Sequence, residues 1–346
     1  MNMENNLTNE TEAVLPSEAA HASLAPRDLV AHLFDEPAPA DTRWTPEYLA
    51  TLRRENLTKP VIFLGAGTCG LGAGEAKVAE VVRQWINAKG AEVDVVEVGC
   101  IGLCSAEPLM DVQMPGCTRV CFQNVAPEQV NEILDGVWKG DVLKDSVFGQ
   151  FRDRNFKAYE NVPFVEDHPF FKPQTRWVLA NVGKINPVKI DEYIARGGYR
   201  AIAKVTRSMT PVEVCDTVEQ SGLRGRGGGG FPTGTKWKFA LKSASDQKYL
   251  ICNADEGDPG AFMDRAGIEG DPHRMLEGMM VAAYAIGASK AYVYIRAEYP
   301  LAIARLRDAI KQAKEYGLLG YNILNSGFNL EIIIKMGAGA FVCGEE

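Results

Sequence analysis

The stretch GLRGRGGGGFPTGTKWKF, residues 222–239, holds seven glycines, two arginines and two lysines. Glycine weakens both helices and strands, so such a concentration of glycine needs a specific purpose. A backbone without Cβ atoms lets its N–H groups approach an anion closely. Arg224, Arg226, Lys236 and Lys238 can offset phosphate charge beside it. The stretch therefore predicts a phosphate-binding loop, and a flexible surface loop is the alternative.

The same stretch contains the pattern G-x-G-x-x-G at Gly225, Gly227 and Gly230. In a Rossmann dinucleotide site this pattern follows a strand and opens a helix. Here it follows residues 211–221, whose apolar residues have helical spacing. A Rossmann site is therefore disfavoured, although the phosphate-binding chemistry of the loop still applies.

Length and charge favour a two-domain globular protein. The chain has 346 residues, of which 46% are hydrophobic and 24% charged, with a formal net charge of −8. This acidic balance argues against general nucleic-acid binding. No secretory signal is visible, and the longest apolar window, 279–295, is short for a membrane span. We expect a cytoplasmic protein without a direct membrane span, with a peripheral place on a membrane complex as the alternative.

Composition and periodicity divide the chain into four parts. Residues 1–45 are predicted to be a disordered tail, because they are polar and lack apolar periodicity. Residues 58–138 follow the order β-α-β-β-β-α, with strands at 60–65, 92–98, 108–113 and 119–124 and helices at 76–90 and from 127. Residues 139–175 are expected to be an irregular, aromatic-rich linker that packs on the next domain.

Residues 176–346 alternate strands and helices, which predicts a second α/β layered domain. The expected helices cover 188–198, 211–222, 272–288 and 300–317, and the expected strands cover 248–255, 291–298 and 330–337.

The stretch CNADEGDPGAFMDR, residues 252–265, places acids directly after a predicted strand. Ligands of open α/β sheets bind at the carboxyl ends of strands. Asp255, Glu256 and Asp258 can accept hydrogen bonds from ligand hydroxyls there, and Asn253 can reach a heterocycle edge. A Mg²⁺-dependent nucleotide enzyme is a competing interpretation, since clustered acids suit hard cations. The third interpretation is a solvent-exposed acidic turn without a ligand.

These two stretches and the final GAGAFVCGEE, residues 337–346, resemble in their order the flavin-bearing NADH-oxidising subunit of respiratory complex I. The same subunit type occurs in NAD(P)-linked hydrogenases, formate dehydrogenases and electron-bifurcating complexes. The resemblance covers about 176–346 and implies an FMN-binding α/β domain that passes electrons from NAD(P)H through FMN to iron–sulfur clusters.

The resemblance also implies binding residues, and it implies no catalytic side chain because flavin accepts hydride directly. Gly225, Gly227 and Gly228 would line the flavin or its phosphate, and Lys236 would contact FMN near the NADH site. Asn253, Asp255 and Glu256 would bind the ribityl chain and the ring edge. Phe231, Phe239 and Glu346 would meet the nicotinamide nucleotide, and Gly344 and Glu345 would lie beside the isoalloxazine.

Three departures from the family pattern affect these expectations. Phe341 stands where the family often has Tyr, and Asp258 where it often has Glu, and either change could alter the choice between NADH and NADPH. The family also continues beyond this point with cysteines that hold a 4Fe–4S cluster, and those cysteines are absent here. The chain is therefore expected to be a C-terminally truncated fragment.

The cysteines of the first domain resemble those of thioredoxin-like 2Fe–2S ferredoxins. Cys69 lies in GAGTCGLGAG, and Cys100 and Cys104 form a C-x3-C pair. Such clusters are held by four thiolates. The resemblance places the fourth cysteine at position 64, where this chain has Leu64. Cys121 or Cys117 could supply it. A second interpretation is a non-cysteine fourth ligand or a three-cysteine site. A third is a domain that has lost its cluster and serves for docking.

The sequence thus predicts an NAD(P)H dehydrogenase subunit whose partners are NADH or NADPH and the iron–sulfur subunits of a larger complex. The alternative is a non-catalytic electron carrier or docking subunit that uses only its N-terminal domain. The terminal electron acceptor does not follow from the sequence.

Overall fold

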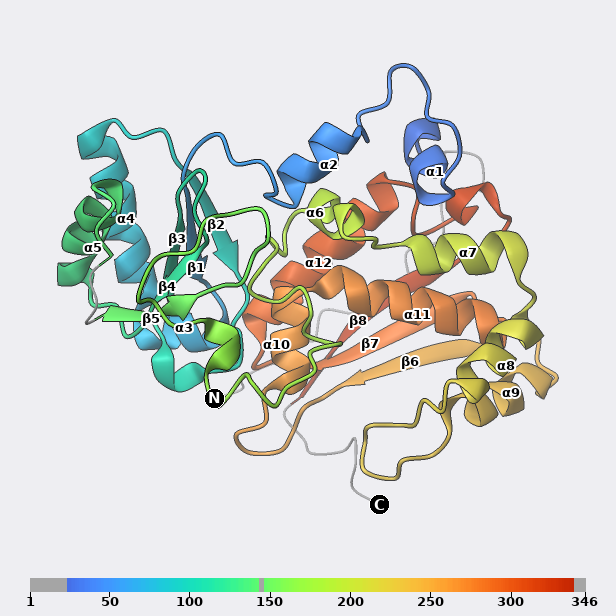
Figure 1. Ribbon diagram of the computed structural model, residues 1–346. Helices are drawn as coiled ribbons and strands as arrows, with labels where there is room; N and C mark the ends of the chain where they lie inside the picture. The colour runs from blue at the N-terminus through green and yellow to red at the C-terminus, as the bar shows by residue number, and fades with distance from the viewer. Residues whose placement is uncertain (1–23, 143–145, 339–346) are drawn as a thin grey trace, which may run out of the picture.

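The computed structural model describes residues 24–142 and 146–338, which form two α/β units side by side (Figure 1). The first unit is built on a five-stranded sheet with the order β2-β1-β3-β4-β5. Its strands are β1 Val61–Gly65, β2 Asp94–Val98, β3 Met110–Gln113, β4 Val120–Phe122 and β5 Val147–Gln150, and its helices are α3 Thr68–Ala73, α4 Glu75–Lys89 and α5 Val130–Trp138.

The pairing of these strands confirms the predicted thioredoxin-like class of the first unit. β1 and β2 are parallel, whereas β3, β4 and β5 add on in antiparallel pairs. β1 is buried along its whole length. Val78, Val82 and Trp85 of α4 pack against the Ile62 side of that strand, and α4 ends at Gly90 in a left-handed conformation that glycine tolerates.

The second unit carries a parallel sheet with the order β6-β7-β8. Its strands are β6 Tyr249–Ala254, β7 Lys290–Arg296 and β8 Glu331–Gly337, and its helices are α6 Ile190–Ala195, α7 Arg200–Ser208, α8 Pro211–Gln220, α9 Thr233–Lys242, α10 Met263–Gly270, α11 Pro272–Ile286 and α12 Pro300–Glu315. Along β7 every second residue is buried, as in a strand with one covered face.

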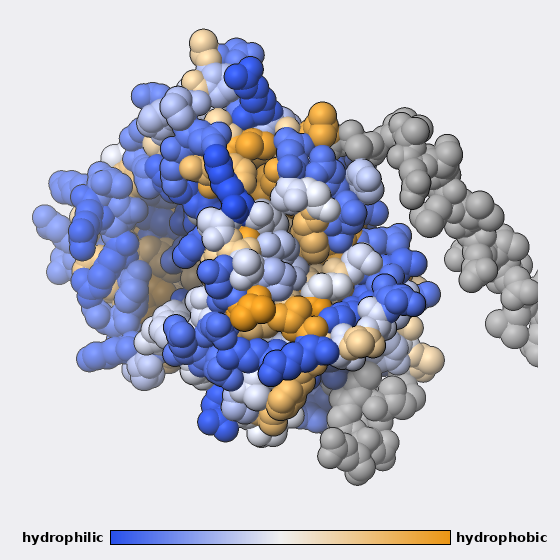
Figure 2. All heavy atoms as spheres, turned by 90° about the vertical axis from the view of Figure 1, so that its right-hand side faces the viewer, coloured by the Kyte–Doolittle hydropathy of each residue, from blue (hydrophilic) through white to orange (hydrophobic). Residues whose placement is uncertain are grey.

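The core of this unit lies between the sheet and the helices drawn above it, with α11 across the middle (Figure 1). The face that bears α8, α9 and the start of β6 is less well covered, and apolar side chains gather between charged ones there (Figure 2). Exposed apolar residues of these elements are Val212, Phe239, Tyr249 and Ile251.

Two segments differ from the sequence-based expectations. Within the predicted tail 1–45, residues 27–33 form the helix α1, and Leu29, Leu33 and Trp44 are buried in the core of the second unit. A second helix, α2 Pro46–Leu52, follows. Leu29 and Leu33 lie one helical turn apart, but seven residues are too short a stretch for this spacing to stand out in the sequence, so burial in the core of the second unit decided the outcome. Residues 1–23 lie outside the described part of the chain.

The expected linker 139–175 also differs, because it contains β5, the edge strand of the first sheet. Its aromatic residues Phe148, Phe151 and Phe171 pack with Ile101 and Cys121 of the first unit rather than on the second. The aromatic content of the segment therefore reflects a small core of its own.

Among the described residues, no helix combines the length and the apolar character that crossing a membrane requires.

One buried acid in the first unit gives a testable pH dependence. Glu75, at the start of α4, is 1% exposed, and neither carboxylate oxygen has a hydrogen-bond partner among the described residues. Burial, and then the nearby acids Glu107 and Asp111, raise the pKa of Glu75 to about 9. Because the folded pKa lies above the ordinary 4.5, the stability linked to this proton is lost as pH rises toward 9.

We therefore expect Glu75→Gln to stabilise the protein at pH 8 by about 1–3 kcal/mol and to have little effect at pH 4.5. Urea unfolding at both pH values, followed by tryptophan fluorescence, measures the difference. Glu80→Gln, an exposed position on the same helix, is the matched control. Equal pH dependence in the Glu75→Gln variant and the parent chain would contradict the assignment.

Candidate functional site

The glycine-rich stretch forms a closed loop between α8 and α9. The Gly225 N–H donates to the Phe231 carbonyl at 2.8 Å, and the Thr233 N–H donates to the Leu223 carbonyl at 2.9 Å. Arg224 Nε donates across the loop to the Gly230 carbonyl at 2.6 Å. These bonds hold the two ends together and leave residues 226–229 as an exposed arch.

The arch has the backbone shape and the open space that an anion needs. A Cβ added at Gly227, Gly228 or Gly229 would meet no atom within 4 Å, so nothing in the described chain fills that space. Gly228 has φ +100, a conformation that residues with side chains rarely adopt. Arg226 and Lys236 are exposed, and neither forms an ion pair with a described residue. The loop therefore presents free N–H groups and free cations to solvent.

Close contact between α8 and α9 fixes the end of the loop. A Cβ at Gly234 would overlap the backbone nitrogen of Glu219, so the two helices approach as closely as they do only because Gly234 has no side chain. Lys238 of α9 forms ion pairs with Asp216 at 2.6 Å and Glu219 at 2.5 Å on α8. Lys238 thus serves the packing of the helices, and Arg226 and Lys236 remain for a ligand.

We expect Gly234→Ala to lower the free energy of unfolding by about 1–3 kcal/mol, because the added methyl group meets backbone rather than a flexible side chain. Thermal unfolding measures this loss. Gly278→Ala, in the middle of α11, is the control, since a Cβ there meets nothing within 4 Å. A Gly234→Ala variant as stable as the Gly278→Ala variant would refute the close approach.

The acidic stretch forms the turn that follows β6, on the same lower side of the sheet as the glycine-rich loop in Figure 1. Asn253 Oδ1 accepts the Asp255 N–H at 3.1 Å, which shapes the start of the turn. Asp255 is half-buried and Asp258 is exposed. The strand end therefore carries Asn253, Asp255 and Asp258 at its rim.

Glu256 has a structural task that the sequence did not suggest. Its two carboxylate oxygens accept the N–H groups of Asp264 and Arg265 at 3.0 and 3.2 Å, at the start of α10. A carboxylate at a helix N-terminus satisfies free donors and opposes the helix dipole. Among the described residues, the acids of this turn also form no cluster of three ligands close enough for a metal ion. The geometry therefore does not support a Mg²⁺ site.

The aromatic residues predicted to meet the nucleotide lie near each other. Phe231 and Phe239 have ring centroids 6.4 Å apart, and they are 50% and 62% exposed. They present apolar surface beside the arch of the loop. Phe341, Gly344, Glu345 and Glu346 lie outside the described residues.

Three of the four predicted metal ligands come together in the first unit. The sulfur atoms of Cys69, Cys100 and Cys104 lie within 4.8 Å of one another. Cys69 and Cys104 are 3.2 Å apart, and the Gly102 N–H donates to Cys100 Sγ at 3.3 Å. Cys69 lies in the first turn of α3, because the glycine-rich stretch that was expected to be a loop forms a short helix.

The fourth predicted ligand, Cys121, does not belong to this cysteine triad. Cys121 lies on β4, is 1% exposed, and packs with Ile101, Leu109 and Val165. Its buried position raises the pKa of its thiol well above the ordinary value. Cys117 is not in the triad either, and Leu64 is fully buried in β1. Within the described residues, the structure thus provides three thiols at one place and a fourth in a separate apolar core.

The two units meet where the triad faces α10, and Arg265 contacts both sides. Its Nη2 lies 3.4 Å from Cys69 Sγ, and its backbone N–H donates to Glu256 in the acidic turn. Glu269, one helical turn later, accepts the backbone N–H of Thr68 at 2.9 Å and also bonds the Thr68 hydroxyl. Burial raises the pKa of the Cys69 thiol, and the Arg265 guanidinium opposes that rise because a nearby positive charge favours the thiolate.

Buried hydrogen bonds and a close backbone contact also join the two units at this junction. Arg305 of α12 is 5% exposed and donates to the carbonyls of Glu269 at 2.6 Å and Ala66 at 2.8 Å. A Cβ at Gly99 would lie 2.5 Å from the Gly270 Cα. The backbone of the first unit therefore contacts the backbone of the second unit directly at these two glycines. Sequence inspection missed Arg265, Glu269 and Arg305, since only the packing of the two units gives them partners.

Comparisons with known proteins define the second unit. Residues 218–346 match the family described as the Nuo51 FMN-binding domain. The chain is 62% identical over 175 residues to the NADP-reducing hydrogenase subunit HndC of Solidesulfovibrio fructosivorans. It is 57% identical over 190 residues to an NADH-quinone oxidoreductase subunit of Aquifex aeolicus. These matches cover 51% and 55% of this chain but only 35% and 43% of the two relatives.

Similar solved structures include a NAD⁺-reducing [NiFe]-hydrogenase in the H2-reduced state, with a TM-score of 0.40 and 24% identity over 94% of this chain and 53% of the other. A thioredoxin-like [2Fe–2S] ferredoxin from Aquifex aeolicus matches with a TM-score of 0.24 and 18% identity, over 28% of this chain and 94% of the ferredoxin.

Most of the second unit, residues 218–346, therefore matches a family of flavin-binding modules. More specifically, the match is to the Nuo51 FMN-binding domain, which confirms the resemblance inferred from the glycine-rich, acidic and C-terminal stretches.

Proposed function

We propose that this chain is the NAD(P)H-oxidising flavoprotein part of a larger oxidoreductase complex, with NADH or NADPH as its electron donor. The observation that carries the proposal is Arg265, which contacts the predicted flavin-site turn through its backbone and Cys69 through its side chain. A flavin site and an iron–sulfur site that both adjoin Arg265 of one helix suit transfer of electrons between them.

The residues present fit a flavin mononucleotide. The open arch at Gly227 and Gly228 leaves space for a phosphate group, and Arg226 and Lys236 supply charge opposite to that of phosphate. When bound, FMN accepts a hydride from reduced nicotinamide and releases the electrons singly. The chain binds and orients the reactants: Asn253 and Asp255 would hold the ribityl chain and ring edge, and Phe231 and Phe239 the nicotinamide nucleotide. Asp258, Phe341, Gly344, Glu345 and Glu346 complete the proposed set.

The cysteine triad fits an iron–sulfur cluster in three of its four ligands. Cys69, Cys100 and Cys104 would hold a 2Fe–2S cluster, with the fourth ligand coming from a residue other than Cys121 or from a partner. Because the relatives are subunits of multi-subunit enzymes by name, we propose that other iron–sulfur subunits receive the electrons, and that the chain is peripheral to such a complex.

Anaerobic reconstitution of the purified chain with FMN tests this function. We expect one flavin to be retained per chain, with flavin absorbance that NADH or NADPH bleaches, and NAD(P)H-dependent reduction of ferricyanide. A chain that retains no flavin and shows only iron–sulfur absorbance would instead be the non-catalytic electron carrier.

A further inference from the structure

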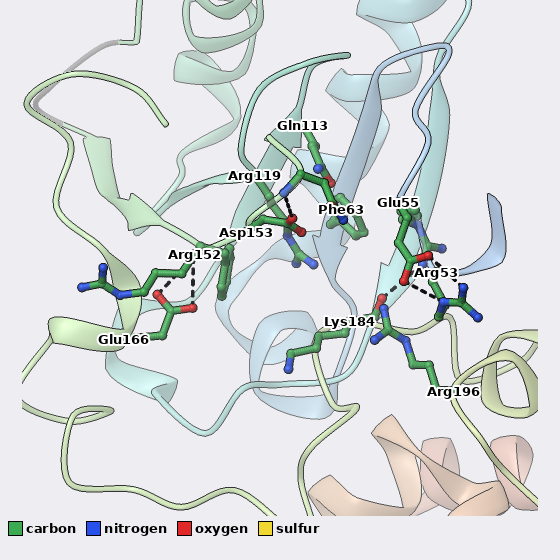
Figure 3. Close-up of a pocket in the computed structure, with 13 residues that line it drawn as sticks. Arg53, Glu55, Phe63, Gln113, Arg119, Arg152, Asp153, Glu166, Lys184 and Arg196 are labelled. Carbon is green, nitrogen blue, oxygen red and sulfur yellow. Dashed lines mark hydrogen bonds and ion pairs between the residues drawn. The ribbon is translucent and has the colours of Figure 1, made fainter. Parts of the chain in front are cut away.

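A cavity of about 270 Å³ lies between the two units, away from both sites described above. Its lining carries six cations and three acids, although the chain as a whole has a net charge of −8. Its charged lining consists of the cations Arg53, Arg54, Arg119, Arg152, Lys184 and Arg196 and the acids Glu55, Asp153 and Glu166. Figure 3 shows these side chains around one hollow, with contributions from both units and from the segments that join them.

Most of these cations already have an acidic partner. Arg53 bonds Glu55 at 2.7 Å, and Arg54 bonds the buried Glu192 at 2.7 Å. Arg119 Nε donates to Asp111 at 2.6 Å, and its guanidinium stacks 3.6 Å from the Phe63 ring centroid. These pairs line the cavity, and the acidic partners balance most of the charge of the three arginines.

Lys184 and Arg196 differ from the others, since neither forms an ion pair with a described residue. Arg196 Nε is buried without a hydrogen-bond partner. Burial, and then repulsion from Arg54, lower the pKa of Arg196, whereas Lys184 lines the same cavity with an exposed side chain. Arg176, on an adjoining cavity that Lys184 also lines, has two more buried nitrogens without partners.

Unpaired cations gathered in a partly closed space destabilise a protein unless an anion balances them. The planar fork of an arginine and the compact charge of a lysine together match the several oxygens of a phosphate group. A cavity of about 270 Å³ is near the lower limit of small-molecule sites.

We propose that this cavity binds a phosphate-bearing small molecule, with Lys184 and Arg196 as its main ligands, and that the bound anion joins the two units. The anion would be either free inorganic phosphate or pyrophosphate, or the phosphate group of a mononucleotide. This site is separate from the glycine-rich loop, so it does not depend on the proposed flavin function.

Isothermal titration of the full chain with inorganic phosphate, pyrophosphate and AMP, at constant ionic strength set with NaCl, tests the proposal. We expect saturable binding that weakens about tenfold or more in Lys184→Gln and in Arg196→Gln, because each removes a charge-assisted bond. Lys204→Gln is the matched control, since Lys204 is exposed on α7, and it should bind like the parent chain. Tighter binding of AMP than of phosphate would identify a nucleotide as the source.

A second measurement separates binding from misfolding. Without phosphate, Arg196→Gln should melt at or above the temperature of the parent chain, because it removes a partly buried cation that has no ion-pair partner among the described residues. With phosphate, the parent should gain stability and the variant should not. Equal affinity in Lys184→Gln and Lys204→Gln, loss of binding only in the loop variant Arg226→Gln, or no saturable binding would each overturn the proposal.

Discussion

Replacing Gly228 with valine is expected to weaken FMN binding by at least about 30-fold while leaving the fold intact. A β-branched residue at φ +100 is strained by about 1–3 kcal/mol, and its side chain enters the open space where the N–H groups would meet phosphate. The exposed arch has no packing role in the described chain, so the loss should fall on the ligand. Titration of the anaerobic chain with FMN, followed by flavin fluorescence, measures the affinity.

Gly327→Val is the matched control for this effect. Gly327 also has a positive φ of +80 and open space around it, but it lies in a loop between α12 and β8. Its replacement should cost comparable backbone strain and leave FMN binding unchanged. If Gly228→Val bound FMN as well as Gly327→Val, the glycine-rich loop would not be the phosphate site.

Replacing Cys104 with alanine is expected to abolish iron binding by the first unit. Cys104 Sγ lies 3.2 Å from Cys69 Sγ and 4.0 Å from Cys100 Sγ, so Cys104 contacts both of the other cysteines in the triad. A cluster that already lacks a fourth described cysteine should not survive with two. Iron and acid-labile sulfide analysis after reconstitution, with electron paramagnetic resonance of the reduced protein, measures the loss.

Cys121→Ala is the informative comparison, because the sequence made Cys121 a candidate ligand and the structure separates it from the triad. We expect this variant to keep its iron while losing some thermal stability, since it leaves a small cavity among buried residues. If a folded Cys121→Ala variant lost iron as completely as Cys104→Ala, the described geometry would not be that of the cluster-bound protein.

Local sequence patterns predicted most of the strands and the long helices of this protein. Alternation and helical spacing placed β1 to β4, β6 to β8 and the long helices α4, α11 and α12, because burial on one face repeats with the period of the element, whereas the edge strand β5 was missed. The glycine-rich and acidic stretches also indicated the flavin-binding domain, since close approach to a ligand constrains residue type at fixed positions. These features depend on neighbours in sequence, which a sequence displays directly.

Only the tertiary structure decided which distant residues meet. It showed that Glu256 caps α10, that Arg265 reaches Cys69, and that Cys121 belongs to an apolar core rather than to the cysteine triad. It also gathered Lys184 and Arg196 with four arginines from other segments into one cavity. The free energy of a buried charge depends on what surrounds it in space, and that environment is set by the packing of two units against each other rather than by order along the chain.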